Sequence, residues 1–197
     1  MKTSLKSPED PSRRGLVLAV GAVSFAVLAL GLSALQPARA QEVAASLEGN
    51  PITQLIPAEL QNAEGETVSR DSLSGKFVGV YFSAHWCPPC QLFTPKLTKF
   101  YKKHQDEFEI VFVSSDHGPD EKTTYLEEAG MKWLTVPGQS NSQTQKMGGM
   151  LGVRGIPTLA IFDPQGRLLT TEGRQFVESS PNRAMKMWKD ASESAEE

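Results

Sequence analysis

Cysteine is scarce in this sequence. The 197 residues include only two cysteines, Cys87 and Cys90. A small exported domain that is held together by disulfides carries several cysteine pairs, so this count excludes a structural disulfide scaffold. Zinc takes four ligands and the pair supplies two, while the three histidines, His85, His104 and His117, include no second ligand pair. The sequence therefore favours a redox-active pair over half a zinc site and predicts no metal.

Basic excess and repetition are missing as well. Lys and Arg total 20 against 23 Asp and Glu, and the formal net charge is −3. A nucleic-acid-binding surface shows a clustered basic excess, so this composition argues against nucleic acid as a partner. The sequence also contains no internal repeat, which excludes solenoids and similar arrays.

The first 40 residues are typical of a signal peptide. A basic opening precedes an uncharged stretch at residues 15–38, and Ala38-Arg39-Ala40 is a small-x-small cleavage pattern. The uncharged stretch is long enough to span a bilayer, so an uncleaved N-terminal membrane anchor remains open. Arg13-Arg14 before the apolar run leaves the twin-arginine route open beside the ordinary secretory (Sec) route. Each alternative predicts an exported protein on the periplasmic, or extracytoplasmic, side of a bacterial-type inner membrane.

The remainder of the chain predicts one domain. Residues 41–51 are small and polar and predict a linker, and residues 52–190 are enough for a single core. Residues 191–197 predict a disordered acidic tail.

Strand and helix patterns alternate along this domain, which predicts an α/β fold. Residues 77–82 and 108–113 are apolar on both faces, as expected of strands buried from two sides of a sheet. An edge strand at 52–60, an extended segment at 133–137, and a hairpin of 158–162 with 167–171 complete the predicted strands. Helices are predicted from Cys87 to about residue 104, where Leu92 is expected to face the core, and at 120–129, 143–151 and 182–190.

The segment Trp86-Cys87-Pro88-Pro89-Cys90 lies where a buried strand gives way to a helix. Two thiols separated by two residues can close a small disulfide ring, and a helix that starts at the first thiol favours the thiolate. Cys87 is therefore predicted to attack and Cys90 to resolve. Pro88 and Pro89 remove two N–H donors and fix φ, so they are expected to modulate the redox potential. Trp86 abuts a site that must admit a partner chain, and we expect it to be a lid over the disulfide.

Five segments, in order, resemble the tryparedoxin and nucleoredoxin branch of thioredoxin-fold proteins. They are YFSAHWCPPC at 81–90, FTP at 93–95, IVFVS at 110–114, WLTVP at 133–137 and GVRGIPT at 152–158. Together they cover most of residues 60–173, and an ordered set is far more specific than a single Cys-x-x-Cys. With the leader, the chain resembles an exported bacterial form of this branch.

The resemblance implies a thioredoxin fold, in which helices flank a central mixed β-sheet and a cis-proline loop faces the Cys-x-x-Cys motif. The peptide bond before Pro157 is expected to be cis, and Ile156 to present its backbone beside Cys87 to a substrate strand. The implied activity is that of a thiol–disulfide oxidoreductase of the protein-disulfide reductase type. It needs no cofactor besides the Cys87–Cys90 disulfide. Its implied partners are protein or small-thiol disulfides and a membrane or soluble redox partner that recycles it.

Three positions depart from the pattern of relatives. Tyr81 stands where thioredoxins proper carry a buried Asp that assists proton transfer to the second cysteine. Gln91 follows Cys90 where many relatives place a basic residue. His85 replaces a small residue before Trp86; when protonated it could lower the pKa of the nearby thiol, although a histidine in an exposed loop is ordinary.

Other polar and aromatic residues have simpler interpretations. Asp116 and His117 follow a strand's carboxyl end, where functional loops gather in open sheets, but they are predicted to be solvated turn residues. Trp133 and Trp188 are predicted to lie in the core.

Two alternative functions remain open from the sequence. The same motif could form disulfides as an oxidase, which a high reduction potential distinguishes from a reductase. The fold could also serve as a non-catalytic peptide-binding module, whose binding survives loss of both cysteines.

Overall fold

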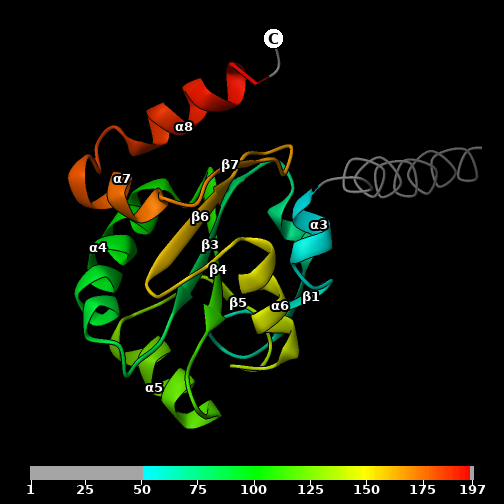
Figure 1. Ribbon diagram of the computed structural model, residues 1–197, viewed down its shortest axis with the longest axis vertical. Helices are drawn as coiled ribbons and strands as arrows, with labels where there is room; N and C mark the ends of the chain where they lie inside the picture. Colours follow the sequence, from blue (N-terminus) through cyan, green and yellow to red (C-terminus); the bar gives the residue numbers. More distant parts are fainter. Residues whose placement is uncertain (1–50, 196–197) are drawn as a thin grey trace, which may run out of the picture. The chain divides into compact units, whose positions relative to one another are not determined.

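The computed structural model describes residues 51–195 of the chain, which lie in one compact unit (Figure 1). The predicted leader at 1–40 and almost all of the predicted linker lie outside the described residues. Seven strands form one sheet in the order β2-β1-β5-β4-β3-β6-β7.

The centre of the sheet is strand β3, Phe77–Ser83, in which every residue is buried. It pairs in parallel with β4, Phe108–Ser114, and antiparallel with β6, Thr158–Phe162. The predicted central strands and the mixed sheet are therefore confirmed. Gly79 is required here, because a Cβ at this position would lie 2.7 Å from the ring of Phe108.

Shorter strands extend the sheet on both sides. β5, Leu134–Thr135, pairs in parallel with β4 and antiparallel with β1, Glu59–Gln61. β1 also pairs antiparallel with β2, Thr67–Ser69, which lies at one edge. At the other edge, β7, Leu168–Thr170, forms the predicted hairpin with β6.

Helices cover both faces of the sheet (Figure 1). One core cluster joins alternate residues of β3 to α4, α5, α7 and α8, and it contains Trp133 and Trp188 as predicted. The other cluster joins the remaining residues of β3 to α3 and α6. The helices are α3, Pro51–Leu55; α4, Pro88–His104; α5, Pro119–Glu128; α6, Ser142–Met150; α7, Gly173–Ser179; α8, Ala184–Glu193; and a 3₁₀ turn at Arg70–Leu73. Within residues 51–195, no helix has the length and apolar character needed to cross a membrane.

The predicted edge strand at 52–60 is wrong. Its first part is helix α3, because Ile52, Leu55 and Ile56 recur at helical spacing and are all buried. Only Glu59–Gln61 is a strand, and β2 rather than β1 occupies the edge.

Two further differences lie near the C-terminus. Helix α7 was not predicted, because it is short and begins at Gly173, a residue that disfavours helix. That glycine is required by close packing, since a Cβ there would lie 2.7 Å from Ile161. Helix α8 continues to Glu193 with Ser192 buried, so residues 191–193 belong to the helix and not to the predicted disordered tail.

Candidate active site

The two cysteines are joined by a disulfide at the start of helix α4, with their Cα atoms 5.2 Å apart. Cys87 is the N-cap residue, and its sulfur accepts a hydrogen bond from the backbone N–H of Cys90 at 3.3 Å. Pro88 and Pro89 occupy the first helical positions, where a missing N–H costs no helical hydrogen bond. After reduction, the same N–H and the helix dipole would stabilise a thiolate on Cys87.

The two sulfur-bearing residues differ in access. Cys87 retains 3% of its surface exposed, whereas Cys90 is completely buried. An incoming thiol can therefore reach the disulfide only from the side of Cys87. This difference agrees with the predicted division into an attacking and a resolving cysteine.

The peptide bond between Ile156 and Pro157 is cis, as the resemblance implied. The sulfur of Cys87 lies 3.8 Å from the carbonyl oxygen of Ile156, so this loop faces the motif. An open groove of about 890 Å³ runs alongside, between the loop at 151–158 and residues 171–178. The structure thus brings Ile156 and Pro157 together with the disulfide.

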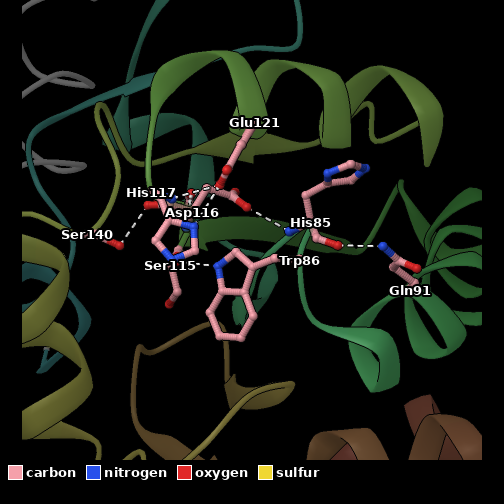
Figure 2. A network of polar contacts seen from close by, with 9 residues as sticks. His85, Trp86, Gln91, Ser115, Asp116, His117, Glu121 and Ser140 are labelled. Carbon is pink, nitrogen blue, oxygen red and sulfur yellow. Dashed lines mark hydrogen bonds and ion pairs between the residues drawn. The ribbon is translucent and has the colours of Figure 1, made fainter.

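Trp86 lies on the surface beside the motif, with 49% of the residue exposed. Its indole Nε1–H donates to the carbonyl oxygen of Ser115 at 3.1 Å, and its ring centroid is 5.5 Å from that of His117 (Figure 2). His117 is exposed, as predicted, and its Nδ1 lies 3.0 Å from Oε2 of Glu121. Trp86 is therefore held against the loop after β4 and is open to a partner.

Asp116 corrects one of the predictions. It is completely buried, not solvated, and its carboxylate accepts hydrogen bonds from His85 N–H at 2.6 Å and from Ser114 Oγ at 2.7 Å. The burial of Asp116 follows from the parallel pairing of β3 with β4, which places Ser83 opposite Ser114. The residues after both strands consequently meet at one edge of the sheet.

The ring of His85 points away from Trp86 (Figure 2). Its Nε2 lies 3.0 Å from Oε2 of Glu128 on helix α5. The partner of the His85 ring is therefore at the C-terminal end of helix α5 and not at Trp86. Its contacts are with Glu128 and Tyr125 rather than with Cys87, so its predicted modulating role stays a prediction.

Comparisons with known proteins agree with these features. A family model described as thioredoxin-like matches residues 75–168. Tryparedoxin from Trypanosoma brucei brucei is 39% identical over 132 residues, which cover 66% of this chain and 90% of the tryparedoxin. The chain belongs to the thioredoxin-like family.

Two other similar proteins show to which thioredoxin-like proteins this chain is related. Nucleoredoxin from Bos taurus is 41% identical over 130 residues, a match that covers 64% of this chain but 29% of the nucleoredoxin. The solved structure of tryparedoxin II from C. fasciculata has a TM-score of 0.62 at 30% identity, with 72% of this chain and 91% of that one covered. The protein thus has the thioredoxin fold and is related to the tryparedoxins and nucleoredoxins, while it spans less than a third of a nucleoredoxin.

Beneath the motif of this thioredoxin-like protein lies a buried cluster of hydroxyl groups. Thr94 Oγ1 donates to the carbonyl oxygen of Cys90 at 2.8 Å and lies 2.8 Å from Tyr81 Oη and 2.5 Å from Tyr125 Oη. Ser83 Oγ lies 2.9 Å from Tyr125 Oη. Burial, and next the proximity of Tyr125, raise the pKa of Tyr81 above its ordinary value, so its phenol stays neutral. The sequence singled out Tyr81, whereas Thr94 stood out only as part of the segment at 93–95 and Tyr125 not at all.

Leu92 is a second correction, because it is 74% exposed and does not face the core. It lies on the outer side of α4, on the same face as Pro88 and Pro89. The apolar spacing of the helix is satisfied without it by Phe93 and Leu97, both completely buried.

In the described part of the chain, no three His, Cys, Asp or Glu side chains are grouped so that they could hold a metal ion. The two cysteines form a covalent bond with each other instead of half a zinc site.

Proposed function

We propose that this protein is a thiol–disulfide oxidoreductase of the protein-disulfide reductase type. The observation that carries the proposal is the Cys87–Cys90 disulfide at a helix N-terminus, in which Cys87 alone keeps a small accessible surface and its sulfur lies 3.8 Å from the carbonyl oxygen of Ile156. Kinship with tryparedoxins and nucleoredoxins supports the same conclusion.

The reaction begins from the reduced dithiol. The Cys87 thiolate attacks one sulfur of a substrate disulfide, the substrate S–S bond breaks, and one substrate thiolate leaves with an electron pair. Cys90 then loses its proton and attacks the Cys87 sulfur of the mixed disulfide, which releases the second substrate thiolate. The substrate gains two electrons and two protons, and the protein is left with its own disulfide.

Substrate binding in this proposal uses main-chain atoms. A peptide that flanks the reacting cysteine pairs as an extended strand with the backbone of Ile156, while the exposed indole of Trp86 supplies an apolar contact. Main-chain pairing does not demand a sequence, so we propose a broad range of protein or small-thiol disulfides as substrates. A separate membrane or soluble redox partner returns the Cys87–Cys90 disulfide to the dithiol.

The test is reduction of insulin disulfides by the purified protein, with dithiothreitol as the electron source. Cys87→Ser is expected to abolish turnover, whereas Cys90→Ser, reduced and freed of dithiothreitol before insulin is added, is expected to accumulate a mixed disulfide that a non-reducing gel detects. Full activity in either variant would overturn the assigned roles. Peptide binding that persists without both cysteines, with no reductase activity in the wild type, would favour a binding module instead.

Whether the protein reduces or forms disulfides in its substrates is tested by the reduction potential of the purified domain. A potential more reducing than that of the surrounding thiols is expected of a reductase, and a strongly oxidising one would reassign the protein as a disulfide-forming oxidase.

We further propose that the leader carries the protein across the inner membrane, where the domain acts on the periplasmic side. N-terminal sequencing of the protein recovered from cell fractions tests this. A mature N-terminus near Gln41 in the periplasmic fraction supports a cleaved signal, an intact chain in the membrane fraction supports an anchor, and cytoplasmic recovery contradicts export.

A further inference from the structure

The backbone of His85 is held from both sides by side chains that the reaction itself does not use. Its N–H donates to Oδ1 of the buried Asp116 at 2.6 Å. Its carbonyl oxygen accepts from Nε2 of Gln91 at 2.5 Å. Figure 2 shows the two contacts approaching this residue from opposite directions. His85 immediately precedes Trp86 and lies two residues before Cys87, so these bonds fix the segment that enters the redox motif.

Asp116 is itself anchored to several parts of the fold. Its second carboxylate oxygen accepts from Ser114 Oγ at 2.7 Å, and its carbonyl oxygen accepts from Ser140 Oγ at 2.8 Å. The neighbouring carbonyl, that of Ser115, accepts the indole N–H of Trp86 at 3.1 Å. Asp116 therefore ties three segments together: the entry to the motif, the end of β4, and the loop before α6.

A buried carboxylate is costly unless donors surround it, and here two donors lie within 2.7 Å. Hydrogen bonds to a charged acceptor are about twice as strong as neutral ones. A neutral loop could close this edge of the sheet without a buried charge. What the carboxyl group of Asp116 adds is a short hydrogen bond to the backbone N–H of His85.

We propose that Asp116 and Gln91 are positioning residues that clamp the backbone of His85 and thereby fix Trp86 for substrate binding. The inference rests on the proposed thiol–disulfide exchange, because it assigns Trp86 to the binding of the substrate. Neither residue touches the reacting sulfurs. Their loss acts on substrate affinity, because the sulfur geometry is set by the N-terminus of helix α4.

The experiment compares steady-state kinetics of insulin reduction for the wild type, Asp116→Ala, Asp116→Asn and Gln91→Ala. Asp116→Ala is expected to raise KM about tenfold, the change that corresponds to ~1.4 kcal/mol. Gln91→Ala, on the surface, is expected to raise KM about threefold, as suits one neutral hydrogen bond. In both variants kcat is expected to change less than about twofold, since the chemical step is untouched.

Asp116→Asn keeps an acceptor for the His85 N–H and an amide that can donate to Ser114 Oγ. Because its remaining bond is to a neutral acceptor, this variant is expected to give a KM between those of the wild type and Asp116→Ala. Iodide quenching of fluorescence provides a readout that does not require activity, because Trp133 and Trp188 are buried and Trp86 is exposed. Quenching is expected to increase in Asp116→Ala and Gln91→Ala.

Asp163→Ala is the matched control. Asp163 is also buried and also accepts a backbone N–H, that of Arg167 at 2.8 Å. It follows Phe162, which pairs with Val78 at the opposite end of β3 from the motif. This variant is expected to lose stability while keeping the KM and the quenching of the wild type.

The clamp is refuted if Gln91→Ala leaves both KM and quenching unchanged, if Asp116→Asn behaves like Asp116→Ala, or if Asp163→Ala alters KM equally. If Asp116→Ala does not fold, the KM and the quenching of Gln91→Ala and Asp116→Asn still test the clamp. An inactive wild type would overturn the proposed function, and the quenching comparison would still test the clamp.

Discussion

Replacing Thr94 by valine should remove the centre of the buried hydroxyl cluster while conserving shape. Thr94 donates its single proton to the carbonyl oxygen of Cys90, so both tyrosine hydroxyls near it must donate to its oxygen. In Thr94→Val the hydroxyl of Tyr125 can turn to Ser83, 2.9 Å away, but that of Tyr81 loses its close partner at 2.8 Å.

The expected loss of stability follows from the hydrogen bonds that Thr94→Val removes. A buried hydroxyl without a partner costs about 1–3 kcal/mol, and the lost bond to the Cys90 carbonyl adds roughly 1 kcal/mol. Thr94→Val should therefore lower the free energy of unfolding by about 2–4 kcal/mol. Because removing both partners is milder than removing one, Tyr81→Phe/Thr94→Val should regain at least about 1 kcal/mol over the single variant.

Urea unfolding of the oxidised protein, with linear extrapolation, measures these differences. Thr98→Val is the control one turn along the same helix, because its hydroxyl makes one long bond, 3.3 Å to the carbonyl oxygen of Ala129. It should cost less than about 1 kcal/mol. A double variant no more stable than Thr94→Val would refute the reasoning, since the Tyr81 hydroxyl must then find another partner.

Three other predictions concern the thiol, a buried amine and the central strand. In the reduced protein, Cys87 should be alkylated at a pH well below that at which an ordinary thiol reacts, because the helix N-terminus stabilises its thiolate; a pH series of iodoacetamide rates on Cys90→Ser checks this. Burial lowers the pKa of Lys122 to about 8 from 10.5, so the unfolded chain binds more protons between these values and stability should rise with pH there. Lys122→Met should lose that rise in urea unfolding at pH 8 to 10, and an equal slope in both proteins would contradict the assignment. Gly79→Ala should destabilise by about 1–3 kcal/mol, because its Cβ would press on Phe108, and thermal unfolding that matches the wild type would count against such close packing.

The sequence predicted the parts of the fold that strong local patterns specify. Strands β3 and β4 are apolar on both faces, a pattern that few other structures produce. Helices α3 and α7 were missed because each is short and its stability comes from packing on the sheet rather than from propensity. Gly173 in particular disfavours a helix locally, yet the close approach of Ile161 admits no larger residue.

In the candidate site, too, the sequence revealed the residues of local motifs and missed those that only the fold brings together. Cys87, Cys90 and Pro157 were found because the motifs around them are contiguous in sequence. The burial of Asp116 was not, because its partner His85 lies 31 positions away and only the parallel register of β3 and β4 brings them together. The isolated pattern Ser-Ser-Asp-His is equally typical of a solvated turn.

The exchange of a buried acid for Tyr81 changes what the region beneath Cys90 can do. A buried carboxylate can take up the proton of the resolving cysteine, as implied for thioredoxins proper. A buried phenol with a raised pKa stays protonated and does not act as that base. Thr94 instead donates to the carbonyl oxygen of Cys90. In the proposed exchange, the proton of Cys90 would therefore pass to the departing substrate thiolate or to water. The buried carboxyl group of this site lies instead at Asp116, where it accepts the backbone N–H of His85. In the proposed exchange, the resolving step would therefore depend on the position of Cys90 and not on a base within this hydroxyl cluster.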